Sequence, residues 1–274
     1  MRGRDLFRRR GAPQPSQRRE DLMARTLAEE YRGLFDDLRA SARNGPWAVL
    51  ARLRELVGQR GVDVGRLRER LNRQFVGETE RVIRDLVANA GDRLAREIGS
   101  LSIPALEAFG SRLAGIRELY LDDAVARIEG EEDELKRTFL ERLDDWATRG
   151  YDLDVSDIVE RMKQAADGRA KFFARDQFSR FNRSVAVASY RQAGAEYVEW
   201  LNSSDVRVRP AAGAKSGPGE YLGMPLNDHR VRNHKIYTQA ELERDPEWKS
   251  YGCRCGFVPL WGPLTAAQER RRVA

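Results

Sequence analysis

Residues 171–201, KFFARDQFSRFNRSVAVASYRQAGAEYVEWL, contain the point at which the chain changes from helix to strand. Apolar residues recur at three- and four-residue steps over the first two thirds, which places them on one helical face: Ala174, Phe178, Phe181, Val185 and Ala188. Gly194 follows where a helix commonly ends, because glycine adopts the left-handed conformation at little cost. Residues 197–200 then alternate in the manner of a strand. The segment predicts a helix over 171–192 followed by a short strand.

The chain before this segment, from Glu20 onward, has the pattern of one helix after another. Narrow apolar stripes at helical spacing run through residues 27–38, 67–87, 106–119 and 125–143. Such stripes are typical of long helices that pack in pairs and not of a globular enzyme core.

After this segment, the helical spacing of apolar residues gives way to short alternating stretches and loops. Val206–Arg209 alternates and predicts a second strand. Residues 210–225 are rich in glycine and proline and predict a loop. The apolar run Phe257–Trp261 closes an irregular module. We therefore expect a mainly α protein with an elongated helical N-terminal region and a small α+β C-terminal module of short strands and irregular loops.

These patterns divide the chain into four predicted parts. They are a flexible basic tail (1–20), a helical arm (21–169), a C-terminal module (170–262) and a C-terminal tail (263–274).

The arginine-rich N-terminal tail is a candidate site for an acidic partner. The 274 residues include 49 Lys and Arg against 43 Asp and Glu, a formal net charge of +6, which is too small to indicate nucleic-acid binding by itself. The tail, however, concentrates arginines that are candidates for contact with nucleic acid or an acidic protein surface: Arg2, Arg4, Arg8, Arg9, Arg10, Arg18 and Arg19. No apolar segment long enough to span a membrane, and none typical of a secretory signal, is found.

The strongest chemical signal is the pair Cys253 and Cys255. One residue separates them, so an ordinary disulfide between them would be strained. The two histidines of the chain, His229 and His234, precede them by about twenty residues, and two thiolates with one or two imidazoles form a sensible zinc set. We predict Cys253, Cys255 and His234 as ligands, with His229 or Asp228 as a fourth. The alternative is two buried thiols beside a hydrogen-bonded histidine, with no cofactor.

Catalytic motifs are missing from the sequence. It contains no phosphate-binding glycine loop, no GxSxG turn and no HExxH helix. A metal-dependent nuclease would need an acid/base residue and a substrate cleft, and the sequence identifies neither. We therefore expect a protein that is not an enzyme, with no catalytic residue.

An ordered set of short motifs in residues 170–260 resembles the Mu F-like minor head proteins of phages, the head-morphogenesis family. The set comprises Phe173-Ala174-Arg175-Asp176-Gln177, Asn182, Tyr190–Gly194, Trp200, Asp205-Val206-Arg207-Val208-Arg209, Asp245-Pro246, Trp248, Gly252-Cys253-Arg254-Cys255 and Pro259. The family's histidine does not follow Arg209. A second stretch downstream, Asp228-His229-Arg230-Val231-Arg232-Asn233-His234, carries it, and His234 is the better match.

The same residues have a structural interpretation that does not depend on the family. Asp205 or Asp228 can pair with arginines such as Arg230 and Arg232 on a neighbouring strand, and Arg254 can reach a carboxylate. The result would be a small cross-braced β module.

The resemblance implies a structural protein of the phage head. Members bind near the portal or inside the shell and act in head assembly or DNA packaging and delivery. The implied partners are the portal protein, the major capsid protein or phage DNA, with several copies per particle and no membrane. The implied location is the virion, with the host cytoplasm during assembly. One alternative is a zinc-stabilised nucleic-acid-binding module with a helical arm; a nuclease or toxin-like enzyme is another.

Overall fold

The computed structural model describes residues 17–41, 46–59, 61–89, 96, 99–100, 103–149, 155–202, 219–250, 253 and 255–273. Several predicted features lie outside these residues. They are the arginines before residue 17, the strand predicted at 206–209, Asp205 and Arg254.

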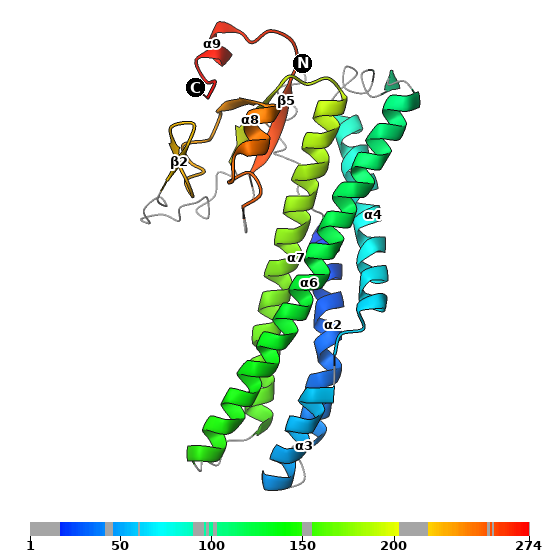
Figure 1. The fold of residues 1–274 in the computed structure, drawn as a ribbon, viewed down its shortest axis with the longest axis vertical. Coiled ribbons are helices and arrows are strands. Elements are labelled where there is room, and N and C mark those ends of the chain that lie inside the picture. The colour runs from blue at the N-terminus through cyan, green and yellow to red at the C-terminus, as the bar shows by residue number, and fades with distance from the viewer. Residues whose placement is uncertain are drawn as a thin grey trace. The chain divides into compact units, whose positions relative to one another are not determined.

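Five long helices occupy most of the N-terminal two thirds, which confirms the mainly α prediction (Figure 1). They are α2 (Gln17–Ser41), α3 (Pro46–Gln59), α4 (Val64–Asn89), α6 (Ile103–Arg149) and α7 (Val155–Gln192). Because α2 begins at Gln17, Arg18 and Arg19 belong to a helix and not to the predicted tail.

Helix α7 joins two segments that the sequence pattern separates, a short amphipathic helix near 155–162 and the helix at 171–192. The connecting residues, KQAADGRA at 163–170, contain no proline and are mostly good helix formers. One glycine, Gly168, costs too little to end a helix that is continued on both sides. Helix α6 likewise runs unbroken through the charged residues that follow Leu119.

The chain divides into two compact units, and α4, α6 and α7 each contribute to both. One unit combines Ser16–Phe75 with Leu119–Arg175 and, where it is described, is helical apart from residues 61–63. Its core is formed by the apolar stripes that the sequence predicts, among them Leu27, Tyr31, Leu71, Ile128 and Phe139. The Tyr31 hydroxyl donates a buried hydrogen bond to the Ile128 carbonyl at 3.0 Å, which fixes α2 against α6.

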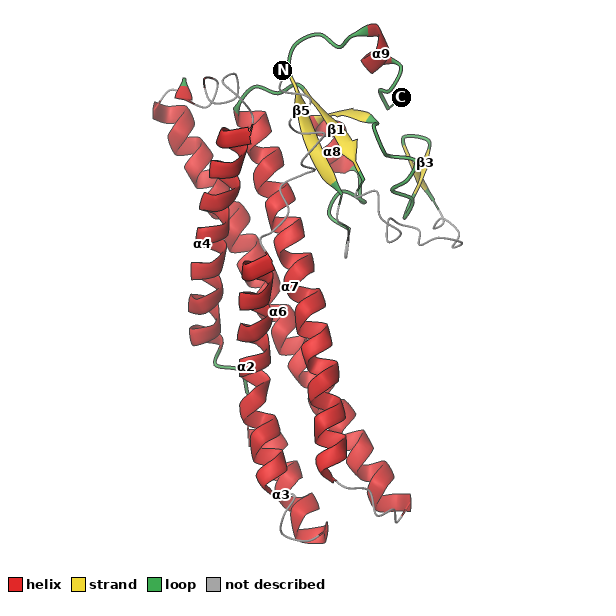
Figure 2. Ribbon diagram, turned by 180° about the vertical axis from the view of Figure 1, so that it is seen from behind, coloured by secondary structure: helices red, strands yellow, loops and turns green. Residues whose placement is uncertain are grey.

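The other unit includes Val76–Glu118 and Asp176–Ala274. A three-stranded antiparallel sheet of order β4-β1-β5 forms its C-terminal part, with β1 in the centre (Figure 2). The strands are β1 (Tyr197–Leu201), β4 (Ile236–Thr238) and β5 (Gly256–Leu260). The minor elements are a two-stranded hairpin of β2 (Glu220–Tyr221) and β3 (Met224–Pro225), and two short helices, α8 (Gln239–Arg244) and α9 (Ala266–Glu269). The expected small α+β module is therefore present.

Side chains fasten the sheet to the end of α7. The Tyr190 hydroxyl, which is fully buried, donates to the Phe257 carbonyl on β5 at 3.1 Å. Trp261 Nε1 donates to the Ala193 carbonyl at 2.9 Å. These two bonds connect the last turn of the helix to both ends of β5.

The residues predicted as a C-terminal tail pack on the edge of the sheet. Thr265 caps α9, and Arg272 then forms a parallel bridge with Ile236. The backbone N–H of Val273 donates to the Ile236 carbonyl at 3.0 Å, and the Val273 side chain is buried. This segment covers the open edge of β4, which would otherwise expose unpaired backbone groups.

The described helices do not include one that is both long and apolar enough to cross a bilayer.

Gly194 is the first residue for which we predict a measurable effect on stability. Its φ is +73°, and the Gly194 and Ala195 N–H groups donate to the last carbonyls of α7. Gly194→Ala should lower the free energy of unfolding by about 1–2 kcal/mol, because alanine is strained in this conformation. The control is Gly168→Ala inside α7, where an added Cβ meets nothing within 4 Å and should stabilise by up to about 1 kcal/mol. Equal effects in urea denaturation would contradict this assignment.

Candidate metal centre

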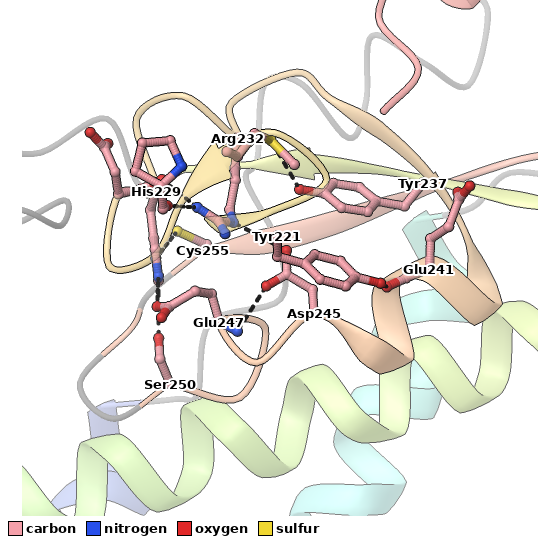
Figure 3. Close-up of polar contacts among 12 residues, drawn as sticks. Tyr221, His229, Arg232, Tyr237, Glu241, Asp245, Glu247, Ser250 and Cys255 are labelled. Carbon is pink, nitrogen blue, oxygen red and sulfur yellow. Dashed lines mark hydrogen bonds and ion pairs between the residues drawn. The ribbon is translucent and has the colours of Figure 1, made fainter. Parts of the chain in front are cut away.

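The structure brings His229, Cys253 and Cys255 together in the C-terminal part of the chain. Figure 3 shows His229 beside Cys255. His229 Nδ1 lies 3.2 Å from Cys253 Sγ and 3.4 Å from Cys255 Sγ. The three side chains are buried, and their ligand atoms lie within 4.8 Å of one another. Tetrahedral zinc holds nitrogen and sulfur ligands about 3.5–3.8 Å apart. The arrangement is thus compatible with a shared metal ion and needs only small adjustments to hold one.

Local backbone structure explains how the cysteines come together. The Cys253 N–H donates to the Ser250 carbonyl at 3.3 Å, and the Cys255 N–H donates to Cys253 Sγ at 3.3 Å. Strand β5 begins one residue later, at Gly256. The two sulfur atoms therefore lie close together just before the chain enters the sheet.

Aromatic packing holds the imidazole in place. The Trp200 ring on β1 meets the His229 ring edge to face, with centroids 5.3 Å apart and an interplanar angle of 77°. The same indole packs against Phe257 on β5 at 5.1 Å. Trp200 is fully buried on the central strand β1, so the candidate centre lies against the middle of the sheet.

The second nitrogen of His229 has its own partners (Figure 3). His229 Nε2 lies 2.9 Å from Glu247 Oε2 and 3.3 Å from Ser250 Oγ. A carboxylate at this position accepts the Nε2 proton and leaves Nδ1 directed at the sulfurs, as in carboxylate–histidine–zinc arrangements. Glu247 is itself positioned by its backbone N–H, which donates to Asp245 Oδ1 at 2.9 Å.

The ionisable groups of the cluster shift each other's pKa values in different directions. Burial opposes the charge on His229, but Cys253 and Glu247 outweigh it and raise the pKa of the imidazole above its ordinary value. Burial also opposes ionisation of Cys253, yet its hydrogen bond with Cys255 and the charges of Arg183 and His229 hold the pKa of Cys253 well below the usual range. The bond with Cys253, with burial, raises the pKa of Cys255. The thiol of Cys253 therefore ionises much more readily than the thiol of Cys255.

His234 and Asp228, also predicted as ligands, face other partners. His234 Nδ1 lies 2.8 Å from Glu199 Oε1, and the imidazole is half exposed. The Asp228 carboxylate accepts from the Arg230 N–H at 3.0 Å and pairs with its guanidinium. Of the predicted ligands, the structure therefore brings His229, Cys253 and Cys255 together, whereas His234 and Asp228 lie beside other groups.

A buried ion pair provides the cross-brace that the sequence predicts, with a different carboxylate. Arg232 Nε donates to Asp245 Oδ2 at 3.1 Å, and both side chains are fully buried. Arg232 Nη1 also donates to the carbonyls of Pro225 and Asp228, at 2.7 and 2.8 Å. The guanidinium carbon lies 5.9 Å from the centroid of the Trp200 ring. Arg232 thus ties the turn before β4 to the segment after α8.

The motif residues of α7 serve packing in both units. In one, Arg175 pairs with Glu20 of α2 at 3.4 Å. In the other, Asn182 Nδ2 donates to Glu78 Oε1 of α4 at 3.0 Å, and both side chains are buried. Asp176 and Gln177 are buried as well.

Sequence reasoning missed Glu247, Ser250 and Arg183. Nothing in its spacing links Glu247 to a histidine eighteen residues away. Arg183 is followed by the small and apolar residues Ser184–Ser189, which predict a helix that is buried on every face at this point.

Comparisons with known proteins assign no family. No family model matches the chain, and no solved structure matches it. An uncharacterized protein of Haemophilus influenzae is 24% identical over 130 residues, which is 44% of this chain. The match covers 26% of that protein, so the chain spans about a quarter of the length of this relative.

Proposed function

We propose that the chain is a minor head protein of a tailed phage, a structural component that binds near the portal or inner shell and acts in head assembly or DNA packaging and delivery. One observation carries the proposal beyond the resemblance itself: the described motif residues from Asp176 to Cys255 are largely buried in one compact unit. They include Asp176, Gln177, Asn182, Trp200, Arg232, Asp245, Cys253 and Cys255. Buried side chains that bond to each other support a structural role, because a substrate cannot reach them.

The two parts of the fold suit this role differently. Long helices with charged exposed faces offer extended surfaces to the portal or major capsid protein. The C-terminal module is braced internally by Arg232 and Asp245, so it can keep its shape while the helices bind partners.

We further propose that His229, Cys253 and Cys255 hold one zinc ion with a structural role. Two thiolates and an imidazole are the donors that zinc prefers, and the sheet beneath them is small. In such a module, metal binding supplies folding free energy directly. Bound zinc would connect the cysteines before β5 to the segment that carries His229.

The decisive experiment is the protein content of purified particles. Heads assembled in cells that express this chain with its neighbouring head genes should contain it in a few to tens of copies, in fixed ratio to the portal protein. Mass spectrometry gives the ratio, and a particle map gives the position. Absence of the chain from DNA-filled heads would contradict the proposal.

A second candidate, a zinc-stabilised nucleic-acid-binding module, is favoured by the same metal site together with the basic N-terminus. It makes a separate prediction. Deleting residues 1–16 removes five arginines and leaves α2 intact, so DNA affinity should fall and become less dependent on salt. The slope of log affinity against log salt should decrease by up to about 4.5, since each phosphate contact contributes about 0.9. An unchanged slope would exclude the tail as a DNA contact and favour a protein partner.

A further inference from the structure

The edge strand β4 is completed by a segment that follows β5 along the chain, the C-terminal segment (residues 262–273). Ile236 forms a parallel bridge with Arg272. The Ile236 N–H donates to the Arg271 carbonyl at 2.9 Å, and the Ile236 carbonyl accepts from the Val273 N–H at 3.0 Å. This is the backbone pattern of strand addition, in which an extended peptide pairs with a sheet edge. The stretch that pairs is two arginines followed by a valine.

Side chains of the module contact each residue of this stretch. Arg271 Nη1 donates to Glu199 Oε1 on β1 at 2.7 Å. Arg272 Nη2 donates to Glu241 Oε1 on α8 at 3.0 Å. The side chain of Val273 is buried. The edge therefore offers one carboxylate to each arginine and an apolar site to the valine.

The groups that receive the segment are held in place by other parts of the module. Glu199 Oε1 also lies 2.8 Å from His234 Nδ1. Glu241 Oε2 accepts from the Thr238 N–H at 2.6 Å, within the capping box of α8. Ile236 pairs with Glu199 in the ladder between β4 and β1. The site on the sheet thus does not need the segment in order to form.

The segment itself has few ties before it reaches the sheet. A loop joins β5 to α9 (Figure 2). Within the described part of the chain, the hydrogen bonds of residues 262–270 all stay inside the C-terminal segment. Gly262 has a φ of +67° and precedes Pro263, whereas the residue before a proline favours an extended backbone with negative φ. The connection after Trp261 therefore has a second, extended conformation, which leads the segment away from its own sheet.

We propose that the edge of β4 is a strand-addition site for an extended segment of two basic residues and one apolar residue, and that neighbouring copies of this chain exchange residues 271–273 across it. Every copy carries the same segment and the same edge. An exchanged segment therefore makes the same contacts as before, and only the connection after Trp261 changes. Several copies held at one place favour exchange, because the local concentration of segments is high. The inference does not depend on the proposed zinc ion.

Peptide binding to the full-length chain tests the strand-addition site. Val273→Asp should release the chain's own segment and open the edge, because a carboxylate is costly in a buried apolar position. A fluorescent peptide of residues 263–274 should then bind once per chain. The same peptide with Val273→Ser keeps its charge but loses the apolar contact, so it should bind more than about 10-fold more weakly. The wild type should also bind the unaltered peptide at least about 10-fold more weakly, since its own segment competes at a millimolar effective concentration.

A measurement on the wild type covers the case in which Val273→Asp does not fold. Peptide at several millimolar should displace the chain's own segment, so hydrogen exchange of residues 265–273 should become faster. Exchange at Ile236 should stay slow, because the peptide takes over the hydrogen bond. The strand-addition site is overturned if the folded variant binds both peptides equally or neither of them. Where the variant is unfolded, unchanged exchange in the wild type overturns it.

Light scattering on a chain with a shorter connection tests the exchange between copies. Deleting Gly262 and Pro263 removes about 7 Å of reach and should keep the segment from its own β4. The shortened chain should form dimers or larger closed oligomers at tens of micromolar, and the same deletion with Val273→Asp should stay monomeric. If the peptide binds but the shortened chain is a monomer, exchange is overturned and the edge serves only the chain's own segment. The proposed head function is tested separately by the protein content of particles.

Discussion

Replacing His229 with alanine should remove zinc from the protein, whereas replacing His234 should not. His229 Nδ1 faces both sulfurs, while His234 Nδ1 faces Glu199. Loss of a ligand should weaken zinc binding by more than the roughly 100-fold that follows loss of an outer partner. Elemental analysis of protein purified without chelator should therefore find about one zinc per chain in the wild type and in His234→Ala, and almost none in His229→Ala.

The folding of the C-terminal module should depend on bound zinc. Apparent zinc-binding free energies in small metal-dependent domains are about 10–16 kcal/mol, enough to decide whether such a module folds. His229→Ala, Cys253→Ser and chelation of the wild type should all expose the module to protease and release a helical fragment that ends near residues 195–225. His234→Ala is the matched control and should resist cleavage as the wild type does. A wild type that is metal-free yet fully folded and protease-resistant would contradict the zinc proposal and leave two buried thiols beside a hydrogen-bonded histidine.

Arg232 should be the most sensitive charged residue outside the metal ligands. Arg232→Met leaves the buried carboxylate of Asp245 without its partner and removes a donor from the Pro225 and Asp228 carbonyls. Breaking a fully buried ion pair in this way costs about 3–5 kcal/mol. The variant should lose that much unfolding free energy in urea denaturation followed by tryptophan fluorescence.

Arg230 provides a control two residues away. Its side chain is half exposed and pairs with Asp228 at 3.4 Å, so Arg230→Met should cost less than about 1 kcal/mol. A double variant, Arg232→Met with Asp245→Leu, should recover part of the loss, because removing both partners leaves no buried charge unpaired. Equal losses for Arg230→Met and Arg232→Met would show that the buried pair does not brace the module.

The sequence by itself determined the elements whose signals are local. The apolar face of α7, the end of that helix just before Gly194 and the strand at Tyr197–Trp200 were all found in the structure, although β1 buries three consecutive residues and does not alternate. Each depends on residues within a few turns of one another, which periodicity and conformational preference capture. The thiol pair was also visible, because cysteine is rare in this chain and its two copies are nearly adjacent.

Only the tertiary structure decided which groups meet. Nothing local distinguishes His229 from His234, and they separate because the turn before β4 directs one to the cysteines and the other to Glu199. For the same reason the carboxylate that pairs with Arg232 is that of Asp245, while Asp228 offers Arg232 only its backbone carbonyl. Such pairings join residues from tens of positions apart, so they depend on how the helix and strands pack, and the spacing of residues along the chain does not encode them.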